Sequence, residues 1–220
     1  MKETRKTMIK LPEIMKEKIG ANKWFTEFDD DGNHIVEHRL NVFWNENKSL
    51  ITNYARGRLL GVKAEYESHL STLTDEQFDT FVGDLDDLDT TSTFKSTLRL
   101  TFGYNLLTPT LTHSVVGLFS SKALQLKLKR AMGDSCTEDH LFGVTEVGTQ
   151  VFLAYKNSDW DLDYIVNEWL PQHLYLWLTV KILKAEHQGD NSIARGKHTL
   201  EEKIALQHYD DVNVPIEVHM

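Results

Sequence analysis

The chain of 220 residues has few of the features of a secreted, disulfide-bonded or membrane-spanning protein. It contains one cysteine, Cys136, which excludes a disulfide within the chain and a zinc site built on paired cysteines. No apolar run approaches the roughly 20 residues that a membrane-spanning helix needs. Residues 1–10 are charged and have no apolar centre, which is not the pattern of a secretory signal peptide. We therefore expect a soluble, cytoplasmic protein.

An excess of positive charge is also absent. The chain has 24 lysine and arginine residues against 33 aspartate and glutamate residues, a formal net charge of −9. This balance argues against a protein that binds polyanions over its whole surface, although a local basic groove still permits contact with phosphates. With 40% hydrophobic residues, the chain can bury a core as one domain or as two small ones.

Several common functional motifs are missing. No Gly-x-Ser-x-Gly sequence is present, which excludes the nucleophile elbow of a serine hydrolase. The phosphate-loop motif is incomplete, because Asn191 occupies the place of the glycine five residues before Gly196. A calcium loop beginning at Asp29 would need glycine and glutamate where His34 and Leu40 stand.

The pattern of apolar residues predicts an α+β protein with two regions. The first region, residues 1–90, is predicted to hold a short helix that begins near Pro12, and then a β-hairpin. The hairpin turns at residues 29–33, and its second strand covers residues 34–44. An acidic and threonine-rich stretch at residues 84–93 marks the predicted boundary between the regions.

The second region, residues 91–220, is predicted to be mainly helical. Ser120 and Ser121 cap a helix that runs to about Met132 and ends at Gly133, a usual C-terminal signal. Three further helices are predicted, at 161–169, at 172–187 after a break at Pro171, and at 199–209, before a closing extended segment at 212–219.

One short run carries the strongest sign of chemistry. It is Thr137-Glu138-Asp139-His140, and two apolar residues follow it. A carboxylate can hold a divalent cation while a neighbouring imidazole removes a proton from water. This combination is typical of a metal-dependent nuclease. The alternative is an Asp-His pair that only forms hydrogen bonds within the fold.

The order of features in residues 108–219 resembles the HNH, or ββα-metal, endonucleases of restriction enzymes and phage genomes. That branch of the family carries a Thr-x-Asp/Glu-His segment, then a Thr-x-Glu-Glu-Asn segment that opens a helix, and then an aromatic residue. Here the run that ends at His140 is followed by Thr-Leu-Glu-Glu-Lys at 199–203 and by Tyr209. The resemblance implies a site with two strands, at 137–142 and 150–155.

The resemblance also assigns roles to individual residues. Asp139 would bind the metal ion, Mg²⁺ or Mn²⁺, and His140 would be the general base that activates water to attack double-stranded DNA. Where the family has asparagine, this chain has Lys203, and a protonated lysine cannot bind a cation. Three residues are candidates to replace that ligand: Glu202, His198 and His173.

Structural roles remain open for several of these candidates. Glu202 stands three residues after Thr199, so a capping box explains it without a metal, and His173 fits a histidine satisfied within the core. Four cations of the helix after Ser121 would track the DNA backbone, although a solvated helix face is the alternative: Lys122, Lys127, Lys129 and Arg130.

The leading expectation is a DNA endonuclease, in which residues 1–90 add target recognition or contacts between two copies of the chain. A different class is a non-catalytic interaction protein, such as a phage inhibitor that binds a host protein through its acidic surface, and the lysine at 203 favours it. A third is a nuclease fold retained only to bind DNA. His140→Ala separates them, because only the nuclease would lose cleavage.

Overall fold

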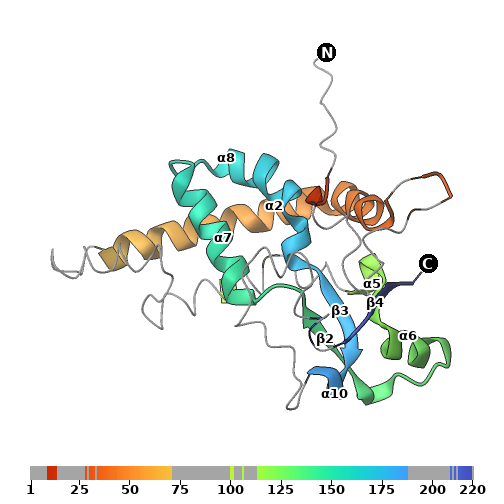
Figure 1. Ribbon diagram of the computed structural model, residues 1–220. Coiled ribbons are helices and arrows are strands. Elements are labelled where there is room, and N and C mark those ends of the chain that lie inside the picture. The colour runs from red at the N-terminus through yellow and green to blue at the C-terminus, as the bar shows by residue number, and fades with distance from the viewer. Residues whose placement is uncertain are drawn as a thin grey trace. The chain divides into compact units, whose positions relative to one another are not determined.

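The computed structural model describes residues 9–13, 28, 30–32, 34–70, 100–101, 106, 113–187, 209, 211 and 213–219. These residues form helices and one sheet, so the protein has the mixed α and β character that the apolar pattern predicts (Figure 1). The chain divides into two compact units, each made of separate stretches. Unit 1 consists of Met1–Glu46, Thr110–Phe142 and Pro171–Met220, and unit 2 consists of Asn47–Pro109 and Gly143–Leu170.

The longest element is helix α2, Ile35–Leu70, which contributes residues to both units. Its buried apolar positions recur mostly every three or four residues, the period of one helix face: Val36, Leu40, Phe43, Trp44, Ile51, Ala55, Leu59, Val62 and Tyr66. The extended run predicted at 34–44 is therefore wrong, because a helical period sustained over eight turns outweighs a short local alternation. Of the hairpin, the described residues retain a turn and an isolated bridge between Phe28 and His34.

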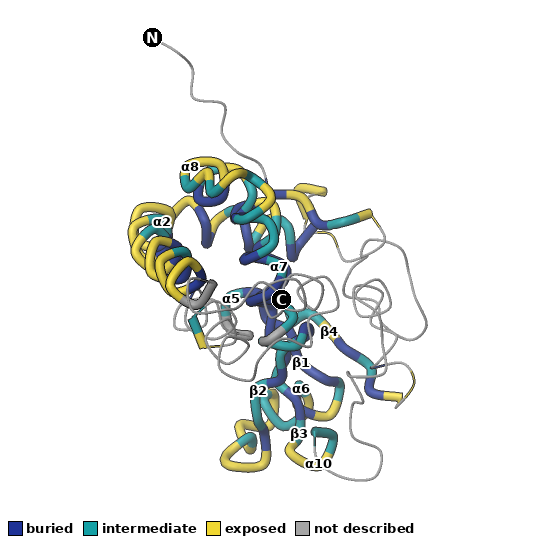
Figure 2. The backbone as a smooth tube through the Cα atoms, turned by 90° about the vertical axis from the view of Figure 1, so that its left-hand side faces the viewer, coloured by how far each residue is buried: buried dark blue, intermediate teal, exposed yellow. Residues whose placement is uncertain are grey.

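Unit 1 contains a four-stranded sheet in the order β2-β3-β1-β4. Its strands are β1 (Leu118–Ser120), β2 (Cys136–His140), β3 (Thr179–Leu183) and β4 (Ile216–Val218). Strand β3 runs parallel to β1 and antiparallel to β2, and β4 runs antiparallel to β1. In Figure 2, most residues of this sheet are coloured as buried or intermediate. The extended segments predicted at 137–142 and 212–219 are thus present in shortened form.

The segment predicted as one helix at 172–187 instead consists of a strand with a short helical segment on either side of it. It forms the 3-10 helix η5 (Leu174–Trp177), strand β3 and the short helix α10 (Lys184–His187). Every residue from 174 to 180 is buried. A continuous buried apolar run is compatible with a buried helix as well as with a strand, so its periodicity did not reveal that a strand begins within it.

Helix α6, Ser121–Leu128, begins where its capping signal predicts. The Oγ of Ser120 accepts a hydrogen bond from the backbone N–H of Ala123, 3.3 Å away. The helix ends at Leu128, earlier than predicted, and the chain then turns through Arg130, which has a φ of 56°. Helix α6 packs its Ala123 side chain against Phe119 and Cys136, so it covers one face of the sheet.

Unit 2 contains helix α7 (Val144–Asn157), and the second strand predicted at 150–155 is therefore wrong. The buried residues Val147, Val151 and Tyr155 recur every four positions, so the helical period decides this segment. The ring of Trp160 lies 5.0 Å from that of Tyr155, centroid to centroid, in an edge-to-face contact. Such aromatic contacts stabilise the pair beyond simple burial.

The helix after α7 also continues further than expected. It consists of α8 (Leu162–Tyr164), the π-helical segment η4 (Ile165–Trp169) and α9 (Leu170–Gln172). Pro171 was predicted to break the helix, but it lies within α9. Among the described residues, no helix has both the length and the apolar character to cross a lipid bilayer. The helix predicted at 199–209 and the boundary at 84–93 lie outside the described residues, apart from Tyr209.

Candidate functional site

Asp139 and His140 are the last two residues of strand β2. Neighbouring residues of a strand point to opposite faces of a sheet, and the register is regular here, since Asp139 pairs with Val180 and His140 with Thr179. The carboxylate and the imidazole therefore project to different sides. The structure does not bring the two groups of the predicted site together on one face.

The carboxylate of Asp139 lies in a buried polar cluster. The residue is 1% exposed. The hydroxyl of Tyr209 donates a hydrogen bond to Oδ2 over 2.7 Å, and Nε2 of His187 lies 3.4 Å from Oδ1. A carboxylate removed from water needs such polar partners. We call these three residues, Asp139, His187 and Tyr209, the Asp139 centre.

The imidazole of His187 connects the Asp139 centre to solvent. The His187 side chain is 39% exposed, whereas the side chains of Asp139 and Tyr209 are almost fully buried. His187 is the last residue of α10, which directly follows strand β3. A ligand that enters from solvent would therefore meet the imidazole first and the carboxylate behind it.

Glu186, the neighbour of His187, fixes the position of α10. Its Oε2 accepts hydrogen bonds from Ser120 Oγ over 2.7 Å and from the backbone N–H of Leu183 over 2.9 Å. Its Oε1 lies 3.8 Å from Nζ of Lys122. These contacts hold α10 against β1 and the start of α6, and so they also constrain where the His187 imidazole lies.

His140 lies on the other face of the sheet. Burial lowers the pKa of its imidazole, and the nearby charge of Glu138 offsets part of this effect. Burial thus favours the neutral ring, the form that can accept a proton. Its strand partner Thr179 is 1% exposed, and within the described part of the chain its Oγ1 has no hydrogen-bond partner.

The four cations predicted to contact DNA belong to α6 and to the turn after it. Lys122, Lys129 and Arg130 are exposed, while Nζ of Lys127 lies 4.3 Å from the centroid of the Phe119 ring in a cation–π contact. Because α6 packs on the face of Phe119, it covers the same face as His140. Of the four, Lys122 is linked to α10 through Glu186.

Of the three candidates for a second metal ligand, His173 alone lies within the described residues. His173 lies in the turn before η5, with its ring 5.9 Å from that of Tyr175, centroid to centroid. Glu202, His198 and Lys203 lie outside the described residues, so their roles stay predictions. Among the residues described, no group of three or more His, Cys, Asp or Glu side chains could hold a metal ion.

Sequence reasoning missed His187 as a partner of Asp139. It was assigned to the end of a long helix, which hid its position just past a central strand. The β-branched residues Thr179, Val180 and Ile182 were the available signal for that strand. Tyr209 was noted as the aromatic residue of the resemblance, but without its hydrogen bond to the carboxylate.

Comparison of the chain with known protein families, with curated proteins and with solved structures gives no match in any of the three.

Proposed function

We propose that the protein is a metal-dependent phosphodiesterase that cleaves DNA, with the Asp139 centre as its metal site. One observation carries the proposal: a buried carboxylate on the first strand of an antiparallel pair contacts an imidazole from the helix that directly follows the second strand. This strand–strand–helix unit of β2, β3 and α10 supports the resemblance to the ββα-metal endonucleases. The second strand and the helix of this unit are residues 179–183 and 184–187. These are not the segments that the sequence resemblance implies.

The donors of the Asp139 centre suit a divalent cation. Two ligand atoms that are each about 2.1 Å from one ion, at angles of 90–109°, lie about 3.0–3.4 Å apart, and the Asp139 and His187 atoms are 3.4 Å apart. A carboxylate and an imidazole together suit Mn²⁺ better than Mg²⁺, which prefers oxygen ligands. A bound ion would polarise the phosphodiester and lower the pKa of a water molecule.

The protein groups around that site have separate tasks. Asp139 and His187 would hold the cation, and the Tyr209 hydroxyl would orient the carboxylate through its hydrogen bond to Oδ2. His140 lies on the opposite face of β2, so we expect it to contribute less to cleavage than His187 does. Lys122, which is exposed and is linked to α10 through Glu186, is the cation that would contact the DNA backbone beside the Asp139 centre.

The test is a cleavage assay on plasmid and phage DNA with Mn²⁺, with Mg²⁺ and with EDTA. We expect discrete fragments that depend on the metal. Asp139→Asn and His187→Gln should each lower the cleavage rate by at least about 100-fold and weaken Mn²⁺ binding in calorimetry. The matched controls are Asp134→Asn and His38→Gln, which change exposed residues of unit 1 and should leave both measurements unchanged.

Two outcomes would overturn the proposal. If the unchanged protein neither cleaves DNA nor binds Mn²⁺, the non-catalytic interaction protein becomes the better reading. If it binds DNA without cleaving it, the fold is retained for binding alone. A loss of cleavage in His140→Ala with full activity in His187→Gln would instead return the catalytic role to the residue that the sequence favours.

A further inference from the structure

Unit 2 contains a cleft with a volume of about 420 Å³. Its lining comes from two helical segments that follow each other in the chain: Ala154, Asn157 and Ser158 at the end of α7, Tyr164 of α8, and Trp169 at the end of η4. The volume falls in the range of small-molecule sites, about 300–1,000 Å³. None of the lining residues belongs to the Asp139 centre, so the DNA-cleavage proposal does not use this cleft.

Two aromatic side chains give the cleft its chemical character. Tyr164 is 40% exposed, and Trp169 is half-buried. The face of an aromatic ring carries partial negative charge and attracts cations, most strongly in tryptophan. The amide of Asn157 is exposed beside them, with an oxygen that can accept a hydrogen bond from an N–H donor.

The stretch of chain from the first to the last residue that lines the cleft carries mostly one sign of charge. Residues 154–169 include four carboxylates and one ammonium group, that of Lys156, and all four carboxylates are exposed: Asp159, Asp161, Asp163 and Glu168. Two of them have assigned partners, because Asp163 pairs with Arg56 and Asp161 accepts a hydrogen bond from the backbone of Tyr164.

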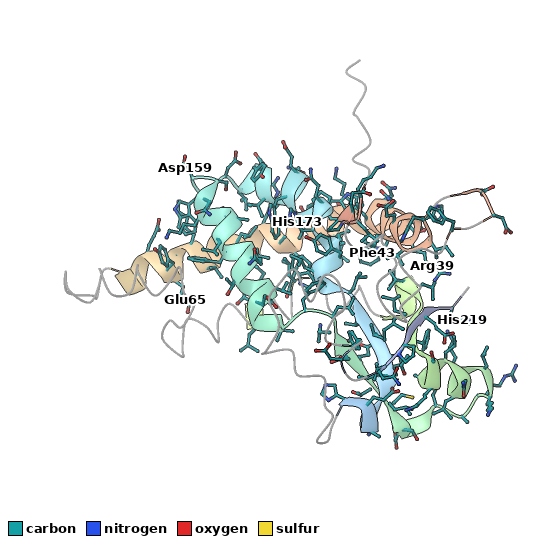
Figure 3. All side chains as sticks on the ribbon, viewed as in Figure 1. Arg39, Phe43, Glu65, Asp159, His173 and His219 are labelled. Carbon is teal, nitrogen blue, oxygen red and sulfur yellow. The ribbon has the colours of Figure 1, made fainter. Side chains whose placement is uncertain are left out.

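The other two carboxylates are available to a ligand. Asp159 lies in the turn after α7 (Figure 3), and within the described part of the chain neither Asp159 nor Glu168 forms an ion pair. The C-terminal end of α7 adds partial negative charge at the same place. A phosphate would be repelled here, whereas a cation would be attracted both by the carboxylates and by the ring faces.

We propose that this cleft binds an organic cation through an ammonium or guanidinium group. Trp169 and Tyr164 supply the ring faces, Asn157 supplies a hydrogen-bond acceptor, and Asp159 and Glu168 supply the attracting charge. An arginine side chain of a basic peptide and a free polyamine carry the same chemistry. The choice between them is made by experiment.

Calorimetric titration of the full-length protein tests the proposal with three probes: spermine, an arginine-containing basic peptide, and adenosine monophosphate as the anionic aromatic control. We expect the cations to bind and the nucleotide not to bind. Trp169→Leu should weaken cation binding roughly 2- to 30-fold, and Trp169→Phe should weaken it less. Because both variants keep the net charge, they separate the cleft from general attraction to an acidic protein.

Controls keep the test independent of folding and of the proposed function. Tyr54 is an exposed tyrosine of α2 in unit 2 and does not line the cleft, so Tyr54→Leu should leave cation binding unchanged. Thermal unfolding checks that each variant folds. DNA cleavage should be unchanged in Trp169→Phe. Binding of the peptide alone identifies a protein partner, and binding of spermine as well identifies a general cation site. Cation binding that Trp169→Leu does not weaken, or tighter binding of the nucleotide, overturns the proposal.

Discussion

The two compact units differ in what they bury. In unit 1, the sheet encloses polar side chains, since Ser120, Asp139 and Thr179 are each 1% exposed or less. Both units bury aromatic side chains, such as Phe119 in unit 1 and Phe152 in unit 2. The four carboxylates at residues 154–169 of unit 2 lie at the surface. The units therefore differ in where these carboxylates lie: Asp139 of unit 1 is buried, and those four are exposed.

This difference separates the kinds of chemistry that each unit can support. A buried carboxylate lowers stability unless partners compensate for the lost water, so a fold that needed only packing would place an apolar residue at position 139. Surface carboxylates have no such cost, but solvent weakens their interactions. This difference is consistent with both proposals: metal chemistry benefits from a fixed charge out of water, as in unit 1, and a solvated cation can be recognised by exposed carboxylates, as in unit 2.

Alanine at Gly117 should break this comparison most strongly. Gly117 has a φ of 74°, and an added Cβ would meet Arg39 Nη1 and lie 2.8 Å from the carbonyl oxygen of His219; Figure 3 labels both of these residues. The left-handed conformation alone costs alanine about 1–2 kcal/mol, and the contacts add to it. We expect the free energy of unfolding in urea to fall by about 2–4 kcal/mol.

Gly57 is the matched control in unit 2. It lies inside α2, nothing lies within 4 Å of an added Cβ, and its φ is not positive. Gly57→Ala should therefore raise the free energy of unfolding by about 0.5–1 kcal/mol through the better helix propensity of alanine. Equal losses of stability in the two variants would show that the backbone of unit 1 is not specially constrained at β1.

The sequence predicts the elements that a local pattern marks, and it does not predict contacts between distant residues. Helix α6 was recognised because Ser120 is a local capping signal, and the helical period of α2 was present in the sequence although a short alternation obscured it. Strand β3 continues the apolar run of residues 174–180, so no clear alternation marks where it begins. The Asp139 centre joins residues 70 positions apart, Asp139 and Tyr209, and no local pattern relates residues at that distance.

Removing the hydroxyl of Tyr209 tests how much one hydrogen bond to the buried carboxylate of unit 1 contributes. Tyr209→Phe removes the donor to the Asp139 carboxylate, which is buried. We expect the free energy of unfolding to fall by about 1–2 kcal/mol, and Mn²⁺ affinity to fall by about 10-fold or more.

Tyr155→Phe is the counterpart in unit 2. Burial raises the pKa of Tyr155, but among the described residues its hydroxyl has no hydrogen-bond partner. The unfolding free energy should change by less than about 0.5 kcal/mol. Equal losses of stability in the two variants would show that the hydrogen bond from Tyr209 to Asp139 adds nothing beyond the packing of the tyrosine ring.

The smallest expected effect is on the pH dependence of stability, and it concerns His140 of unit 1. Burial lowers the pKa of His140 in the folded protein, while the unfolded chain keeps the ordinary value of about 6.5. The unfolded state therefore takes up the proton at a higher pH than the folded state does.

The sign of the effect follows from this order of protonation. The contribution of His140 to stability is fully present above pH about 6.5 and declines as the pH falls through that value toward the lower folded pKa. His140→Gln should flatten this part of the curve when unfolding in urea is measured from pH 5 to pH 8. A slope that His140→Gln leaves intact would mean that the His140 imidazole titrates alike in the folded and unfolded chains.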